Sequence, residues 1–168
     1  MNNILVSKNY VPFFSVIICT YNRGYIIDCA LKSLVNQEEQ DWEAIIVDDG
    51  SNDNTTEIAK RYVAENPKIR YMYHQNKGLA FSRNTGLLAS SGMYCTFLDS
   101  DDEYHPEHLK FRKRMLQQNK DVVLLHGGVE VIGEAMVPDR SNPKKLIYIK
   151  DCAIGGTFCV NRLKAIEI

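Results

Sequence analysis

The sequence predicts an α/β domain with a mostly parallel central sheet. The first observation is an alternation along the chain, in which short runs rich in β-branched and aromatic residues are followed by segments with apolar residues at helical spacing. The second is that a polar cluster follows each of the first four runs, whereas the turns before the runs are shorter and plainer. The third is size, because 168 residues with 45% hydrophobic residues suit one domain with its own core. We therefore expect residues 1–168 to form a single domain whose crossovers are right-handed.

Five runs have the composition of strands. The first two, FFSVIIC and WEAIIVD, are almost wholly apolar and indicate buried strands, and the later runs mix apolar and polar residues. The expected strands are 13–19, 42–48, 69–75, 93–99 and 121–127.

The segments between the runs have helical features. Residues 24–36 carry apolar side chains at helical spacing, and 51–66 begin with residues that can cap a helix and end before Pro67. Residues 78–90 are the third helix, and Pro106 marks the start of a fourth, because proline suits the first position of a helix. Its basic run KFRKRMLQQNK is typical of a solvated helix face.

Beyond Gly128 the pattern is weaker. The segment VEVI either continues the fifth strand or returns as a hairpin across Gly127 and Gly128, and the segment VPDRSNPKK predicts a loop.

The four polar clusters are expected to meet in one crevice. They are TYNR (20–23), DDGS (48–51), HQNKG (74–78) and DSDD (99–102), and each follows the carboxyl end of a predicted strand. In open α/β sheets, ligands bind outside the carboxyl ends of the strands. The clusters are therefore the candidate binding residues.

The fourth cluster predicts a cation site. Asp99 and Asp101 are spaced so that both can direct oxygens at one hard cation, and Mg²⁺ is usually held by one or two carboxylates together with substrate phosphates. A metal would offset the charge of three carboxylates placed so close together. The alternative is a capped turn that opens the next helix.

The other clusters suggest contacts to a nucleotide. An Asp48 or Asp49 carboxylate could accept the imide N–H of a uracil or thymine ring. Lys77 and Arg83 could face a diphosphate or a base edge, and Tyr21 could stack on a base. The alternatives are a plain strand-to-helix turn, surface cations and an aromatic residue that only packs.

Several classes of protein are excluded or disfavoured. No GxGxxG follows the first strand, and no GxxxxGK[ST] or GxSxG is present. A net charge of −1 gives no argument for nucleic acid. His105 and His108 lack the HExxH pattern or nearby cysteines of a zinc site.

Localisation is predicted as cytoplasmic. The five cysteines, Cys19, Cys29, Cys95, Cys152 and Cys159, form no CxxC pair and fit a reducing compartment. No signal peptide is evident, and no apolar stretch approaches the ~20 residues that span a bilayer.

Together, the ordered motifs SVIICTYNR, AIIVDDGSNDNT, NKGLAFSRNTGLLASSG and YCTFLDSDDEYHPEHL resemble family 2 glycosyltransferases. The resemblance covers about residues 13–132 and implies a GT-A (Rossmann-like) βαβ sandwich. It implies a nucleotide-diphosphate-sugar donor, with a UDP-sugar favoured, and Mn²⁺ or Mg²⁺ as cofactor. It also implies inverting transfer to a glycan or lipid-linked acceptor in polysaccharide or cell-surface glycan synthesis. Peripheral contact with a membrane is compatible with such a reaction.

The resemblance also assigns residues. Asp99-Ser100-Asp101 corresponds to the DXD motif, with Asp101 as the favoured metal ligand and Asp99 as a second ligand near the ribose or sugar. The expected nucleotide-binding residues are Thr20, Tyr21, Arg23, Asp48, Asp49, Lys77, Arg83 and Asp99.

One departure concerns the catalytic base. In the family a downstream carboxylate serves as the base, whereas IGGTFCVNRLKAIEI resembles only the stretch before it, so the base is expected beyond Ile168. The sequence therefore predicts the donor-binding part of a longer enzyme, with Glu130, Glu134 and Asp151 as fallback candidates and Glu167 as a poor one. A nucleotidyltransferase and a non-catalytic nucleotide-sugar-binding module remain the alternatives.

Overall fold

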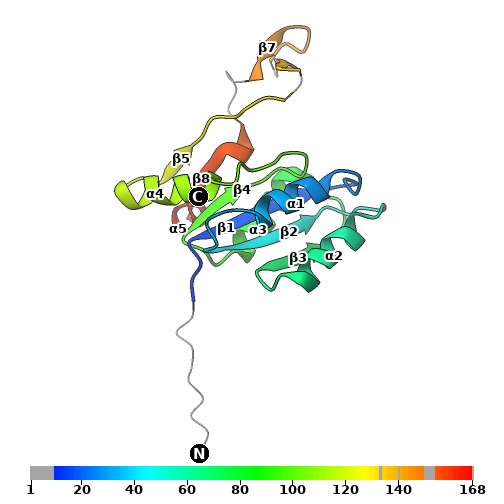
Figure 1. Ribbon diagram of the computed structural model, residues 1–168. Coiled ribbons are helices and arrows are strands. Elements are labelled where there is room, and N and C mark those ends of the chain that lie inside the picture. The colour runs from blue at the N-terminus through cyan, green and yellow to red at the C-terminus, as the bar shows by residue number, and fades with distance from the viewer. Residues whose placement is uncertain (1–9, 133, 140, 150–153, 168) are drawn as a thin grey trace, which may run out of the picture.

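The computed structural model describes residues 10–132, 134–139, 141–149 and 154–167. Its centre is a six-stranded sheet in the order β3-β2-β1-β4-β8-β5 (Figure 1). Neighbours among the first four strands pair in parallel, and β8 pairs antiparallel with both β4 and β5. The predicted mostly parallel sheet is thereby confirmed. The strands are β1 (Phe14–Thr20), β2 (Trp42–Asp48), β3 (Ile69–Tyr73), β4 (Tyr94–Phe97), β5 (Leu124–His126) and β8 (Phe158–Asn161).

Helices cover both faces of the sheet and create two cores. Val16 and Ile18 of β1 belong to the larger core, and Ile17 and Cys19, which alternate with them, belong to the smaller one on the opposite face. The larger core is closed by α1 (Ile27–Val35), α2 (Thr55–Glu65) and α4 (His108–Gln118), and the smaller one is closed by α3 (Leu79–Ala89).

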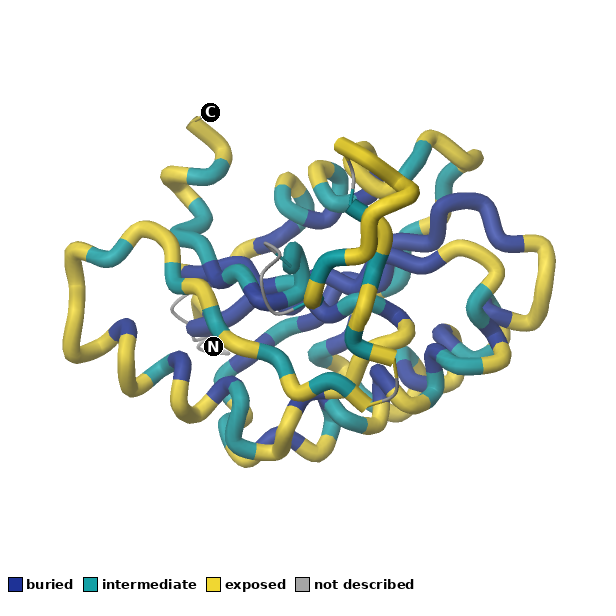
Figure 2. The backbone as a smooth tube through the Cα atoms, turned by 90° about the horizontal axis from the view of Figure 1, so that it is seen from above, coloured by how far each residue is buried: buried dark blue, intermediate teal, exposed yellow. Residues whose placement is uncertain are grey.

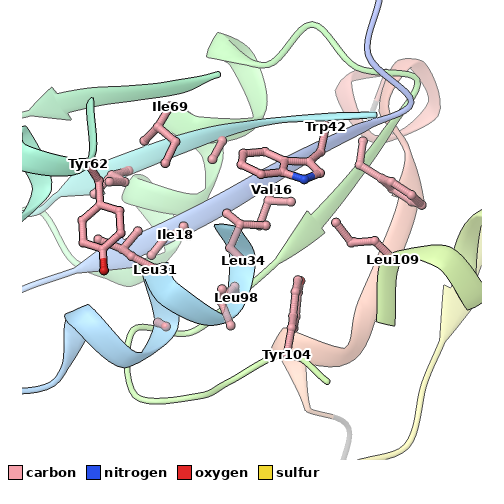
Figure 3. Close-up of a cluster of buried hydrophobic side chains, with 14 of the residues drawn as sticks. Val16, Ile18, Leu31, Leu34, Trp42, Tyr62, Ile69, Leu98, Tyr104 and Leu109 are labelled. Atoms are coloured by element: carbon pink, nitrogen blue, oxygen red, sulfur yellow. The ribbon is translucent and has the colours of Figure 1, made fainter. Parts of the chain in front are cut away.

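The larger core is built around aromatic and aliphatic side chains. Figure 3 shows Trp42 of β2 beside Leu34 of α1, with Leu109 of α4 and Tyr104 lying near them. Figure 2 shows buried backbone through the middle of the domain and exposed backbone along the outer helices and loops. On the other face, Gly86 lets α3 approach β1, because a Cβ there would lie 2.4 Å from Ile17 Cγ2.

The predicted elements up to β5 are confirmed in order, with shifted ends. Helix α4 begins at His108, two residues after Pro106, and β5 has only three residues. Such shifts at the ends of elements are ordinary.

The region after Gly128 corrects the sequence analysis. The described residues of the VEVI segment neither continue β5 nor form a hairpin across Gly127 and Gly128. A hairpin forms later, between β6 (Met136–Pro138) and β7 (Leu146–Tyr148). The segment VPDRSNPKK, predicted as a loop, contributes its first two residues to β6, and the described part of the rest connects the two strands. Figure 1 shows this hairpin standing away from the main sheet. Strands of three residues are too short to give a periodic signal.

Strand β8 was not predicted, and it inserts the end of the described chain into the sheet next to the edge strand β5. It lies between β4 and β5, and the Thr96 hydroxyl of β4 donates to the Phe158 carbonyl at 2.9 Å. A 3₁₀ turn, η2 (Gly155–Thr157), precedes it, and a short helix, α5 (Arg162–Ile166), follows it. The turn therefore lies at the carboxyl end of β4.

The basic run on α4 is not wholly a solvated face. Lys110 and Arg114 are exposed, but Arg112 is buried. The Arg112 guanidinium donates to the Thr96 hydroxyl and the Thr157 carbonyl. Arg112 thus ties α4 to β4 and to the turn before β8.

His108 is partly buried, and its ring packs into the protein. Its ring stacks on Tyr104 with centroids 3.9 Å apart, and its Nε2 is buried without a hydrogen-bond partner in the described structure. Burial, followed by the positive charges of Arg112 and His105, lowers the pKa of His108 to about 3. The folded chain therefore holds His108 neutral.

Replacing His108 by phenylalanine is expected to reduce the acid sensitivity of the fold. In the unfolded chain a histidine titrates near pH 6.5. Below that pH the imidazole binds a proton in the unfolded state but not in the folded state. The free energy of unfolding therefore falls as the pH is lowered, until the pH reaches about 3. Between pH 7 and pH 5 the unaltered chain should lose about 2 kcal/mol more of its unfolding free energy than His108→Phe.

Urea denaturation at the two pH values measures this difference. Met115→Phe is the matched control, because Met115 is an exposed residue of the same helix and its replacement changes no titratable group, so this variant should lose as much unfolding free energy as the unaltered chain. Equal losses in the unaltered chain and in His108→Phe would contradict a buried neutral histidine.

Candidate functional site

The polar ends of β1, β2, β3 and β4 meet at one pocket of about 490 Å³. The first crossover carries the chain from β1 to β2 on one side, whereas β4 lies on the other side of β1. The carboxyl ends of β1 and β4 therefore flank the point where the strand order reverses, which is where open α/β sheets bind ligands. The lining residues are Cys19, Thr20, Tyr21, Arg23, Asp49, Asn76, Gly78, Leu79, Ser82, Asp99, Ser100 and Asp101.

Asp49 is fixed by the segment that follows β3. Its carboxylate accepts the backbone N–H groups of Lys77 at 2.7 Å and of Gly78 at 2.9 Å, and the residue is 5% exposed. The turn after Asp49 packs closely against the same segment. Gly50 in this turn has a φ of +89°, and a Cβ there would lie 2.8 Å from the Asn76 nitrogen. A carboxylate has about four lone-pair positions, so Asp49 keeps capacity for one more donor from the pocket.

Asp48 does not reach the pocket, which corrects the expectation that both aspartates face a nucleotide. It is fully buried, and its carboxylate accepts the Ser51 N–H at 2.8 Å and the Tyr71 hydroxyl at 2.7 Å. Asp48 is the last residue of β2 and lies wholly in the interior, whereas Asp49 follows the strand and lines the pocket. Asp48 holds the β2–α2 turn.

Thr20 offers an unpaired hydroxyl at the pocket. It is 4% exposed, and its Oγ1 is buried with no hydrogen-bond partner in the described structure. A buried polar atom without a partner costs about 1–3 kcal/mol, which a ligand could recover. Tyr21, which follows it, is half exposed at the rim of the pocket.

Both carboxylates of the predicted DXD motif are paired with arginines. Arg83 Nη2 lies 2.8 Å from Asp99 Oδ1, and Arg23 Nη1 lies 3.3 Å from Asp101 Oδ2. Arg83 stands behind Asp99, outside the pocket lining. Lys77 is also outside the lining, with its Nζ 4.5 Å from the centre of the Phe81 ring.

Asp102 lies near Asp99 but does not line the pocket. A Cβ on Gly156 would lie 3.3 Å from Asp99 Oδ2 and 3.5 Å from Asp102 Oδ2, and the Asp102 backbone N–H donates to the Asp99 carbonyl. Much of the residue is exposed, but loss of water around the carboxyl group, followed by the charges of Asp99 and Asp101, raises the pKa of Asp102.

The donor set fits a cation shared with a ligand. Among the described residues, no three His, Cys, Asp or Glu side chains are arranged to hold a metal by themselves. Mg²⁺ and Mn²⁺ need only one or two protein carboxylates where phosphate supplies further oxygens, and Asp99 and Asp101 provide that number at the pocket.

Comparison with known proteins decides the family. Residues 15–153 match the family described as Glycosyl transferase family 2. The chain belongs to glycosyl transferase family 2. It is 32% identical over 156 residues to "Glycosyltransferase GlyG" of Streptococcus pneumoniae, which covers 92% of this chain and 48% of GlyG.

Two further relatives agree. The UDP-Glc:alpha-D-GlcNAc-diphosphoundecaprenol beta-1,3-glucosyltransferase WfgD of Escherichia coli is 31% identical over 146 residues, covering 84% of this chain and 56% of WfgD. The crystal structure of residues 1–349 of S. aureus TarS in complex with UDP matches with a TM-score of 0.67 and 25% identity, over 92% of this chain and 49% of that one. The fold is that of GT-A glycosyltransferases, as the sequence predicted.

This family 2 chain spans only part of the length of its relatives, about half of GlyG and of the TarS structure. In the described ranges, no helix is long and apolar enough to cross a membrane.

Some pocket residues were missed from the sequence. Asn76 and Gly78 belong to the third polar cluster, but Leu79 and Ser82 come from the first turn of α3, whose sequence carries no chemical motif. Gly155 belongs to none either, although a Cβ there would lie 2.7 Å from Arg83 Nη1.

Those fallback candidates for a base that the structure describes do not line the pocket. Glu130 and Glu134 are exposed and do not line it, and Glu167 pairs with Lys164 at 2.8 Å. Asp151 and Cys152 lie outside the described residues.

Proposed function

We propose that this family 2 glycosyltransferase chain binds a UDP-sugar with Mn²⁺ or Mg²⁺ and that its sugar is transferred, with inversion, to a glycan or lipid-linked acceptor. The observation that carries the proposal is the convergence of four polar strand ends on one pocket that contains Thr20, Asp49, Asp99 and Asp101. Each of these groups suits a different part of a nucleotide sugar.

The nucleoside would lie against β1 and β2. Asp49 has remaining acceptor capacity for the imide N–H of uracil, the unpaired Thr20 hydroxyl can bond to the nucleoside, and Tyr21 at the rim can stack on the base. The solved complex of TarS with UDP supports a uridine nucleotide.

The diphosphate would lie against the acidic loop. Asp101 is the proposed metal ligand, and Asp99 would contribute a second oxygen or contact the ribose or sugar. The metal, when bound, stabilises the charge that develops on the leaving nucleoside diphosphate. Arg23 is close enough to face the phosphates, whereas Arg83 would orient Asp99 from behind.

The acceptor is proposed from the relatives. The WfgD name specifies a diphosphoundecaprenol-linked acceptor, which supports a lipid-linked glycan substrate and peripheral contact with a membrane. We place the reaction in the cytoplasm, since the described cysteines Cys19, Cys29, Cys95 and Cys159 are all unpaired.

Titration calorimetry tests the donor site. UDP is expected to bind in the presence of Mn²⁺, with affinity falling at least about 100-fold when a chelator replaces the metal, because the phosphate charges then face Asp99 and Asp101 directly. GDP should bind more weakly than UDP, because guanine does not present the uracil imide to Asp49. Equal UDP affinity with and without metal would contradict the metal role.

Release of pyrophosphate from UTP, without release of UDP from a nucleotide sugar, would instead indicate a nucleotidyltransferase.

A further inference from the structure

The two arginine–aspartate pairs of the pocket differ in how firmly each arginine is held. Arg83 is confined on several sides. Its guanidinium pairs with Asp99 at 2.8 Å, lies 5.4 Å from the centre of the Phe97 ring, and is covered by the Gly155 backbone so closely that a Cβ there would lie 2.7 Å from Nη1. Arg83 therefore has little freedom to leave Asp99.

Arg23 is held much less firmly. Its Nη1 lies 3.3 Å from Asp101 and 2.9 Å from the hydroxyl of Tyr25, a residue that is 76% exposed. The Arg23 and Asp101 side chains are 38% and 45% exposed, so water competes for both partners. An exposed ion pair of this kind typically contributes little free energy, so its arginine can be displaced easily.

The backbone of Arg23 is fixed independently of its side chain. The Arg23 N–H donates to the Thr55 hydroxyl at 3.0 Å, and its carbonyl accepts the N–H groups of Ile26 and Ile27. The β1–α1 loop thus keeps its shape when the guanidinium moves, and a change confined to the side chain should leave the fold intact.

We propose that Arg23 occupies the cation position at Asp101 in the unliganded chain, that the divalent metal displaces it, and that the freed guanidinium binds the diphosphate of the donor. This proposal rests on the proposed function and goes beyond it by coupling two binding events through one side chain. A metal and a guanidinium cannot both lie against the same exposed oxygen of Asp101 without strong repulsion. The arriving diphosphate provides Arg23 with a new partner, which an arginine fork binds well.

This exchange predicts opposite effects of one substitution on two ligands. Arg23→Gln removes the competitor at Asp101, so Mn²⁺ without nucleotide should bind about three- to fivefold more tightly, as expected for loss of an exposed ion pair. The same change removes a charged donor to the diphosphate, so UDP in saturating Mn²⁺ should bind about tenfold more weakly. A substitution that merely damaged the fold would weaken both.

Calorimetric titrations of Mn²⁺ alone, and of UDP at saturating Mn²⁺, measure the two effects. Arg61→Gln is the matched control, because Arg61 is paired with Asp28 (2.6 Å) and neither residue lines the pocket. In this variant the affinities for Mn²⁺ and for UDP should both stay unchanged. Arg23→Lys provides a second variant: a retained cation should keep Mn²⁺ affinity within about twofold of the unaltered chain, while UDP binding weakens because lysine lacks the fork.

The outcomes separate this inference from the proposed function. If the unaltered chain binds UDP with Mn²⁺ but Arg23→Gln binds Mn²⁺ no more tightly, the displacement is wrong and the donor site stands. Unchanged UDP affinity in Arg23→Gln would overturn the transfer of Arg23 to the diphosphate. If the unaltered chain binds no UDP even with Mn²⁺, the proposed function fails, and the coupling fails with it.

Discussion

Asp101→Asn is expected to weaken Mn²⁺-dependent UDP binding by about 100-fold or more. Loss of a group that only supports a metal ligand typically costs 10–100-fold in metal affinity, and loss of the ligand itself should cost more. Asp101 lines the pocket, and its only described ion-pair partner is the loosely held Arg23. Asp99 is already engaged by the confined Arg83, so it cannot easily replace Asp101 as the main ligand. Calorimetry with UDP at several Mn²⁺ concentrations measures the loss, and the residual binding should no longer respond to metal.

Asp102→Asn is the matched control for this experiment. Asp102 adjoins Asp101 in the sequence and has the same side chain, but it does not line the pocket. Its replacement should change the metal-dependent affinity by less than about threefold. A loss as large as that in Asp101→Asn would mean that the ligand has been assigned to the wrong carboxylate.

Asp49→Asn should reduce UDP affinity by about 10–100-fold and remove the preference for uracil over guanine, while the need for metal remains. Both oxygens of Asp49 accept backbone N–H groups, from Lys77 and Gly78. Asparagine has one oxygen, so its NH₂ group would face one of these N–H groups, donor against donor. Hydrogen bonds to a buried charged group are worth about 1.5–3 kcal/mol, which sets the expected range.

Competition titrations with UDP and GDP, with and without Mn²⁺, test this result. Asp28→Asn is the control, because Asp28 also accepts hydrogen bonds, from Tyr62 and Arg61, but lies on α1 outside the pocket lining. A variant that kept its uracil preference and lost its metal dependence would show that Asp49 serves the metal and not the base. Thermal unfolding of each variant checks that a weaker affinity does not reflect an unfolded chain.

The sequence alone was sufficient for the order of the elements up to β5 and for the convergence of the polar clusters on one pocket. Strand β2 has the predicted bounds of 42–48, because a continuous apolar run between turn residues is a strong local signal. The convergence of the four clusters followed from one rule about parallel sheets, which needs only the order of strands and helices. Thr20, Tyr21, Arg23, Asp49, Asp99 and Asp101 accordingly line the pocket as a group.

Only the tertiary structure decided which members of the clusters face the pocket and which groups they meet. Asp48 and Asp49 are the same residue type at adjacent positions, and the exit direction of β2 sends one into the interior and the other into the pocket. The placement of Gly155 against Arg83 depends on β8 inserting between β4 and β5. Local patterns record the conformation of a few neighbouring residues. The pairing of segments far apart in the chain is set by packing and hydrogen bonding across the whole sheet, so β8 and the two arginine–aspartate pairs left no signal in the sequence.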